Sequence, residues 1–197
     1  MKILAVNNIK PKYRIENIVA SGELKIELDL YSLAYKLKDI EYEPEQFPGA
    51  ILKLKEPKSS LLLFKNGKVI CTGAKTEELI KKAILKAFKL VSPYSKTPPP
   101  KRFVVSYDVQ NIVASGELNV SLDLYTLTQK FKQIEYEPEQ FPGAILKLKE
   151  PKSSLLLFKN GKVICTGCKT ETEVKKALAV TAKLLAPYAD PLEENKE

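Results

Sequence analysis

The stretch IEYEPEQFPGAILKLKEPKSSLLLFKNGKVICTG fills residues 40–73 and returns letter for letter at residues 134–167. The same shift, 94 residues from position 40 to position 134, also relates Asn17 to Asn111 outside the identical stretch. A period this long lies outside the range of solenoid and propeller repeats, which recur every few tens of residues. The duplication therefore predicts two fused halves of one fold, a pseudo-dimer that presents the same surface twice.

Composition narrows the class of protein. The 197 residues include 32 lysines and arginines against 24 aspartates and glutamates, which gives a formal net charge of +8. This charge makes phosphate backbones and anionic membrane surfaces candidate partners, with a merely solvated lysine-rich surface as an equal alternative. No apolar run is long enough to span a membrane and no signal-peptide pattern opens the chain, so we expect a soluble intracellular protein.

Histidine is absent, which removes the usual general base and the commonest metal ligand, so we expect no enzyme and no cofactor. The cysteines are Cys71, Cys165 and Cys168, an odd number without secretory context, which argues against an extracellular disulfide framework. Cys165 and Cys168 have C-x-x-C spacing, but Ala74 replaces the second cysteine in the first copy. We expect buried neighbouring thiols, with a disulfide or metal site as the lesser alternative.

Each half is predicted to run strand, short helix, three-stranded meander and long helix. The segment RIENIVASGELKIELDL (14–30) reads as extended with a break at Gly22, and Asp29 is a suitable N-cap for the short helix. The loop YEPEQFPG (42–49) should be exposed and stiff because it contains two prolines, with Phe47 near its tip.

Turn and cap signals define the rest of each half. The pair Asn66-Gly67 predicts a type I′ turn between the last two strands. Beyond Thr76, apolar residues recur at helical spacing and predict a long amphipathic helix. Its counterpart should begin at Thr170 with a capping box to Glu173.

Alternation along the strands leaves one face of the sheet uncovered. Leu61 and Leu63 point to one side, whereas Leu62 and Phe64 point to the other. The long helix can bury only one of these faces, so the other is an interaction surface or, equally, a dimer interface. Lysines surround these strands: Lys53, Lys58, Lys65 and Lys68. An apolar floor with a basic rim suits the minor groove of duplex DNA, which is itself nearly two-fold, better than a protein core.

The motifs NIV, YEPEQFPG, LLLFKNGKV and CTGxK occur in this order in both halves. Together they resemble the TATA-box-binding protein family of general transcription initiation factors, in its archaeal form, over residues 14–188. The resemblance implies an α+β fold, a pseudo-two-fold saddle in which a continuous ten-stranded antiparallel sheet forms the concave DNA-binding face. Four helices would cover the convex face.

The resemblance and the duplication together predict the domain organisation. We expect a first repeat with a short lead-in over residues 1–97, a proline-rich linker over 98–102 and a second repeat over 103–189. Residues 190–197, in the tail ADPLEENKE, should be polar and disordered.

The resemblance also implies site residues, position by position. The DNA-intercalating positions are matched by Phe47, Phe64, Phe141 and Phe158. The alternative for these rings is ordinary core packing, the commoner fate of a strand phenylalanine. Minor-groove base contacts are matched by Asn17, Asn111, Thr72, Thr166, Val19, Val113, Leu62, Leu156, Ile70 and Ile164. Phosphate contacts are matched by Lys53, Lys68, Lys147 and Lys162.

The function implied is that of a non-enzymatic factor that binds TATA-box promoters in double-stranded DNA and bends them by phenylalanine intercalation. It would recruit transcription factor B, through Glu137 and Glu139, and RNA polymerase indirectly. Glu43 and Glu45 occupy the same positions in the first half, so the loop alone does not explain that choice. We expect a monomer on DNA, with a homodimer as an alternative free state.

We expect no membrane association, and a place at the chromosome, in an archaeal cytoplasm or a eukaryotic nucleus. Similar saddle-like halves occur in some DNA glycosylases and nucleases, but the sequence shows neither a helix-hairpin-helix with a nucleophilic lysine nor clustered metal-binding carboxylates. A saddle-fold dimerisation or protein-interaction scaffold without specific DNA binding is the remaining alternative.

Overall fold

The computed structural model describes residues 9–192. The chain divides into two compact units. We call Asn17–Asn111 the first-repeat unit, and Met1–Glu16 together with Ile112–Glu197 the second-repeat unit. The boundaries fall inside two long strands, β1 (Lys12–Glu23) and β6 (Tyr107–Glu117).

Both units repeat one order of elements. After β1 the chain forms α1 (Leu30–Lys36), β2 (Ile40–Glu41), β3 (Ala50–Leu54), β4 (Ser59–Leu63), β5 (Lys68–Ala74), α2 (Glu77–Val91) and the 3-10 helix η1 (Ser92–Tyr94). After β6 it forms β7 (Val120–Leu122), α3 (Leu124–Lys130), β8 (Ile134–Glu135), β9 (Ala144–Leu148), β10 (Ser153–Leu157), β11 (Lys162–Cys168), α4 (Glu171–Leu185), η2 (Ala186–Tyr188) and β12 (Ala189–Pro191).

Ten of the strands form one sheet, in the order β2-β3-β4-β5-β1-β6-β11-β10-β9-β8, while β12 pairs with β7. The pairs within each unit are antiparallel. With four α-helices among residues 9–192, this confirms the predicted α+β fold with a ten-stranded antiparallel sheet. None of the described helices is long and apolar enough to cross a membrane.

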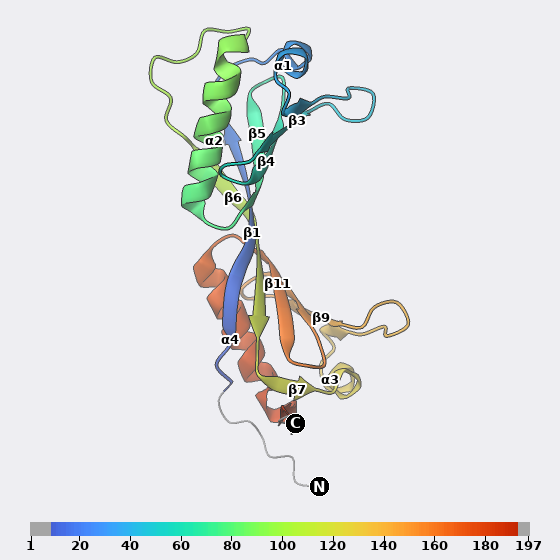
Figure 1. Cartoon of the computed structure of the whole chain (residues 1–197). Coiled ribbons are helices and arrows are strands. Elements are labelled where there is room, and N and C mark those ends of the chain that lie inside the picture. The colour runs from blue at the N-terminus through green and yellow to red at the C-terminus, as the bar shows by residue number, and fades with distance from the viewer. Residues whose placement is uncertain (1–8, 193–197) are drawn as a thin grey trace, which may run out of the picture. The chain divides into compact units, whose positions relative to one another are not determined.

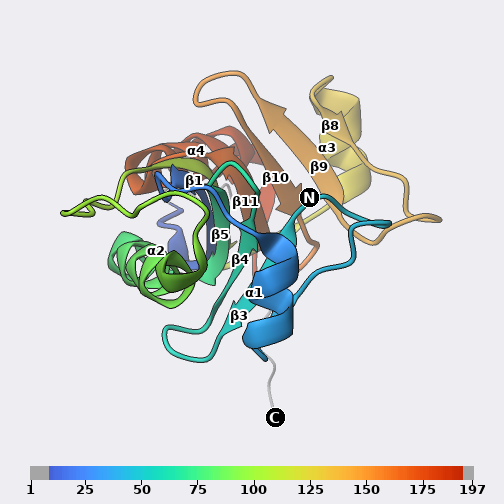
Figure 2. The same ribbon diagram turned by 90° about the horizontal axis from the view of Figure 1, so that it is seen from above.

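One long helix packs against the sheet in each unit. In the first-repeat unit α2 runs along one side of β4 and β5, and the two views agree (Figure 1, Figure 2). Its buried stripe consists of Ile80, Ala83, Ile84, Ala87 and Val91. Phe88 is at helical spacing with these residues but is only half-buried, and its ring stacks on Phe103 with 3.8 Å between centroids. In the second-repeat unit α4 packs on β11 in the same way (Figure 1).

The predicted helix starts are confirmed. Asp29 caps α1 by accepting a hydrogen bond at Oδ1 from the backbone N–H of Ser32, at 3.2 Å. Thr76 caps α2 in the same manner through the N–H of Leu79. Thr170 and Glu173 form the expected capping box at α4. Each cap satisfies backbone donors that a helix leaves without intrahelical partners.

The predicted type I′ turn at Asn66-Gly67 is wrong. Among the described non-glycine residues, positive φ is confined to Lys25 and Asn119, so Asn66 does not take the left-handed conformation that a type I′ turn requires. Instead, Gly67 N–H donates to the Phe64 carbonyl at 2.9 Å and closes a three-residue loop, with Gly67 at φ 78°. Residues 159–161 repeat this turn.

Two further local expectations need correction. Strand β1 continues through Gly22, where no break occurs; the glycine is needed because an added Cβ would lie 2.8 Å from the Ser106 carbonyl oxygen. In the tail expected to be disordered, Ala189–Pro191 forms β12 and pairs with β7. Residues 193–197 of that tail lie outside the described residues.

Candidate nucleic-acid interface

The sheet face away from the long helix carries an apolar floor in each unit. Leu61, Leu63, Val69 and Cys71 are buried on the helix side. The side chains between them point the other way and are only partly buried, which confirms the predicted alternation. The floor residues expected from the sequence are Val19, Leu62, Ile70, Val113, Leu156 and Ile164, of which Ile164 is 37% exposed.

The floor also includes two residues that were not predicted from the sequence, Ile51 and Ile145. Ile51 lies opposite Leu62 across β3 and β4, and Ile145 lies opposite Leu156 across β9 and β10. Ile145 is 39% exposed. The alternation of AILKLK could have revealed both, because it places each isoleucine on the same face as the lysine two residues later.

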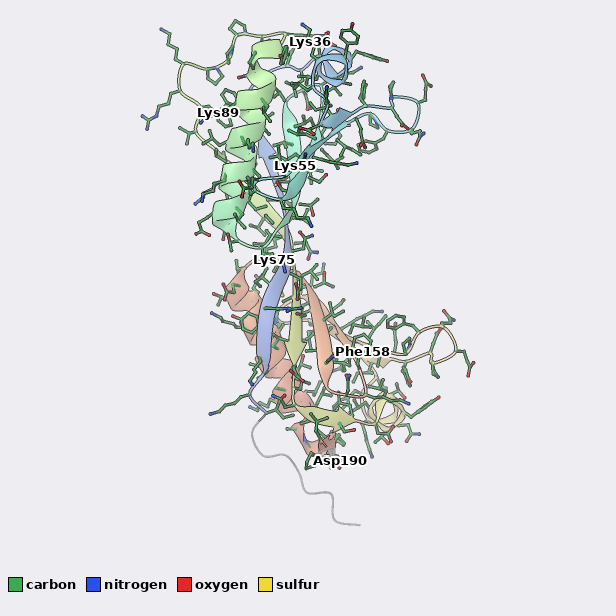
Figure 3. All side chains as sticks on the ribbon, in the orientation of Figure 1. Lys36, Lys55, Lys75, Lys89, Phe158 and Asp190 are labelled. Atoms are coloured by element: carbon green, nitrogen blue, oxygen red, sulfur yellow. The ribbon has the colours of Figure 1, made fainter. Side chains whose placement is uncertain are left out.

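The expected intercalating phenylalanines lie in two pairs. The rings of Phe47 and Phe64 are 6.0 Å apart and inclined by 63°, while those of Phe141 and Phe158 are 6.1 Å apart at 61°. Phe47 and Phe141 remain 41% and 45% exposed, so neither belongs to the core. Phe158 lies on the side of the sheet away from α4 (Figure 3).

The loop before each pair is built to hold the exposed ring in place. The Glu43 carbonyl accepts hydrogen bonds from the N–H groups of Gln46 and Phe47, both at 3.0 Å. A Cβ at Gly49 would lie 2.8 Å from the Phe47 ring, so only glycine allows the ring to fold back over the backbone. Edge-to-face contact then steadies the pair.

Asn17 is held by hydrogen bonds within the first-repeat unit. Its Oδ1 accepts from the Gly73 N–H at 2.7 Å, and its Nδ2 donates to Thr72 Oγ1 at 3.0 Å. Since the carboxamide nitrogen carries two hydrogens, a second N–H can donate to a ligand acceptor. Asn111 and Thr166 occupy the matching positions, and both are engaged in interactions.

Two of the four expected phosphate-binding lysines are ion-paired. Lys53 Nζ lies 2.7 Å from Glu41 Oε1, and Lys147 Nζ lies 2.7 Å from Glu135 Oε1. All four side chains are mostly exposed, so each pair contributes little to stability. Lys68 and Lys162 are exposed at the starts of β5 and β11. The two glutamates were not predicted as partners of these lysines, although both lie in the repeated stretch.

The expected partner-contacting residues Glu137 and Glu139 are exposed in the second loop. The Glu137 carbonyl accepts from the N–H groups of Gln140 and Phe141 at 3.0 Å, the same pattern that Glu43 makes in the first loop. Loop conformation therefore does not distinguish the two copies.

The cysteines are buried free thiols, as the sequence predicted. Cys165 Sγ lies 3.9 Å from Cys168 Sγ, and burial followed by this neighbouring thiol raises the pKa of Cys165 to about 12. Such a thiol is a weak nucleophile at neutral pH. Within residues 9–192, no group of three or more His, Cys, Asp or Glu side chains could hold a metal ion.

Comparison with known proteins also divides the chain into two repeats. The family model for transcription factor TFIID (or TATA-binding protein, TBP) matches residues 12–94 and again residues 106–188. The TATA-box-binding protein of Pyrobaculum calidifontis is 46% identical over 85% of this chain and 83% of the relative. That of Picrophilus torridus is 45% identical over 87% of this chain and 93% of the relative. The solved structure of Methanococcus jannaschii TBP superposes with a TM-score of 0.78 at 39% identity, covering 88% of this chain and 99% of that one. The chain belongs to the TATA-box-binding protein family of DNA-binding transcription factors.

Proposed function

We propose that this chain initiates transcription by binding the TATA box in the minor groove and bending the DNA through its four phenylalanines. The observation that carries the proposal is the pair of edge-to-face rings in each unit, half-exposed beside an apolar floor. Rings presented in this way can insert between base pairs, a mode for which TATA-binding proteins are themselves standard examples. On this proposal the protein acts at the chromosome and is not an enzyme.

The chemistry of the floor favours A·T base pairs. The minor groove of A·T pairs offers only the acceptors A N3 and T O2, whereas guanine adds an amino donor. Apolar side chains such as Leu62 and Ile70 leave that donor without a partner, so G·C pairs are rejected. Asn17 supplies a carboxamide N–H suited to the acceptors of A·T pairs.

The energies explain why charge must assist the rings. Burying four phenylalanines contributes about 6 to 12 kcal/mol at about 1.5 to 3 kcal/mol each. This is an upper bound, since Phe47 and Phe141 are already more than half buried in the free protein. Unstacking costs a few kcal/mol per step and bending of order 1 to 10 kcal/mol. Lysine contacts to phosphates must supply the balance, so binding should weaken steeply with salt.

The proposal extends to partners. Transcription factor B would contact Glu137 and Glu139 on the exposed second loop, and RNA polymerase would follow through that factor. The protein would act as a monomer on DNA. Selection of the second loop over the first must come from surrounding residues, because the two loops have the same sequence and backbone hydrogen bonds.

The test uses a short duplex containing TATAAA, labelled with donor and acceptor dyes at its ends, and a G·C-substituted duplex for comparison. We expect selective binding of the first duplex with shortening of the end-to-end distance. Phe47→Ala combined with Phe141→Ala should abolish the shortening and weaken binding at least tenfold. Tyr35→Ala, which removes a 91% exposed aromatic ring from α1, is the matched control and should change neither.

Equal affinity for both duplexes with an unchanged end-to-end distance would contradict the proposal. Sedimentation of the free protein would then decide whether the apolar face serves self-association instead.

A further inference from the structure

Each unit contains a hollow beside its exposed sheet face, and the 94-residue shift relates the two. The hollow of the second-repeat unit has a volume of about 560 Å³ and is lined in part by Phe158, Asn160 and Lys162. The hollow of the first-repeat unit has a volume of about 570 Å³, with Phe64 and its neighbours in the matching places. All lining residues are of the same type in both hollows except at two positions.

Those two positions give the second-repeat hollow a positive charge. Lys12 and Arg14 line it together with Lys162, against the single carboxylate of Glu117, for a formal charge of +2. Lys12, Arg14 and Lys162 are all exposed to solvent. A cluster of this sign beside an open face favours an anionic ligand.

The first-repeat hollow carries the opposite sign. Ser106 and Asp108 stand where the other hollow has its lysine and arginine. Lys68 is then outweighed by Glu23 and Asp108, for a formal charge of −1. The hollows therefore have nearly the same size but different electrostatics.

Neighbouring side chains hold Arg14 in position. Its Nε pairs with the Glu16 carboxylate and donates to Ser115 Oγ at 3.2 Å, while Ser115 donates to Glu16 Oε1 at 2.6 Å. The guanidinium offers five N–H donors, and these contacts use only its Nε, so its terminal nitrogens can meet a ligand. Counting Glu16 lowers the formal charge around the second-repeat hollow from +2 to +1. The first-repeat hollow has the neutral Gln110 at the matching position and stays at −1, so the two hollows still differ by two charges.

We propose that Lys12, Arg14 and Lys162 form a binding notch for a backbone phosphate of DNA, and that the matching hollow with Asp108 does not. The proposal rests on the proposed function, because Phe158 lines the notch and a base step opened by this ring brings its flanking phosphates near. Arginine can bind a phosphate through two parallel hydrogen bonds, whereas Asp108 repels it. The two units then hold DNA with unequal strength although residues 40–73 and 134–167 are identical.

Exchange of the two positions tests the notch. The double variant K12S/R14D gives the second-repeat hollow the residues of its counterpart, and S106K/D108R does the reverse. We expect K12S/R14D to weaken binding of the TATAAA duplex about 10- to 100-fold at about 0.1 M salt. The plot of log affinity against log salt should become shallower by about one to two units, and S106K/D108R should make it steeper.

A second readout locates the phosphate. Neutral methylphosphonates replace phosphates one at a time along the duplex, and wild-type protein should lose affinity most at positions next to one opened step. K12S/R14D should have lost that sensitivity. Lys89→Ser, on α2 and in the lining of neither hollow, is the control and should bind like wild type.

If K12S/R14D does not fold, the single variant Lys12→Ser tests the notch instead. It should make the plot of log affinity against log salt shallower by about one unit. An unchanged salt dependence in a folded K12S/R14D or K12S variant would overturn the notch while leaving TATA selectivity and bending intact. Loss of selectivity in the wild-type protein would instead overturn the proposed function.

Discussion

Lys53 and Lys147 each hold a glutamate of the neighbouring strand when no DNA is bound. A phosphate must displace Glu41 or Glu135 to reach these lysines, and each displaced carboxylate stays close to the anionic backbone. We expect Glu41→Gln combined with Glu135→Gln to tighten TATA binding about 2- to 10-fold at low salt, since exposed pairs are worth about 0.2–1 kcal/mol each. Fluorescence anisotropy titrations measure this. Glu78→Gln on α2 is the control, and equal tightening by that variant would reveal a general charge effect.

Two equivalent tyrosines tie β1 and β6 to the long helices. Tyr13 donates to Glu171 Oε1 at 2.7 Å and Tyr107 to Glu77 Oε2 at 2.6 Å. Burial, and then the hydrogen bond to Glu77, raises the pKa of Tyr107 from its ordinary value of 10.0 to about 12. A raised folded-state pKa means that the phenol's stabilisation is complete below pH 10 and disappears as the pH rises towards 12.

Tyr107→Phe should therefore remove part of the decrease in melting temperature between pH 10 and 12. Melting curves followed by circular dichroism, compared with those of the exposed-site variant Tyr35→Phe, provide the measurement. If both variants lost stability with pH as steeply as wild type does, Tyr107 would not contribute to the alkaline transition.

At the scale of elements, α4 contains a buried hydroxyl group without a hydrogen-bond partner among the described residues, and α2 has no such group at the matching position. Thr181 is fully buried and its hydroxyl has no hydrogen-bond partner among the described residues, whereas Ala87 holds the matching position in α2. Thr181→Ala should raise the free energy of unfolding by about 0.5 to 1 kcal/mol, because alanine removes the buried polar atom and is the better helix former. Ala87→Thr should lower the free energy of unfolding by a similar amount. Urea denaturation measures both, and destabilisation by Thr181→Ala would mean that lost methyl packing dominates.

Sequence reasoning at this scale was accurate where a local signal decides the structure. Asp29 and Thr170 cap their helices as predicted, because the cap depends on residues only a few positions away. It was wrong at Asn66-Gly67, since the same dipeptide serves both a two-residue turn and a three-residue loop, and strand register decides between them. Gly22 was mistaken for a break because its reason, the close approach of Ser106, lies far along the chain.

For the whole molecule, the duplication predicted two copies of one fold, and the family resemblance implied the ten strands of the main sheet and the four α-helices. The duplication could not show that the start of β1 belongs to the compact unit of the second repeat, because no local pattern encodes a contact between residues so distant in sequence. The anchoring of Arg14 by Ser115 was missed for the same reason, whereas the ion pairs of Lys53 and Lys147 join residues only 12 positions apart and depend on how neighbouring strands pair. Each depends on side chains that meet only after the strands have paired.

The identical strand pairs also affect how the chain folds. Leu61 lies opposite Cys71 in β4 and β5, and Leu155 lies opposite Cys165 in β10 and β11, in the same register and with the same residues. A nascent β4 cannot tell β5 from β11 by any side chain it contacts, so only the short connecting loop favours the correct neighbour. Duplicated chains of this kind are prone to misassembly by strand exchange, within one molecule or between two. The near-identity that presents the same surface twice therefore also creates a competing folding route, which the tight turns at Gly67 and Gly161 oppose by pairing each strand with its nearest neighbour in sequence.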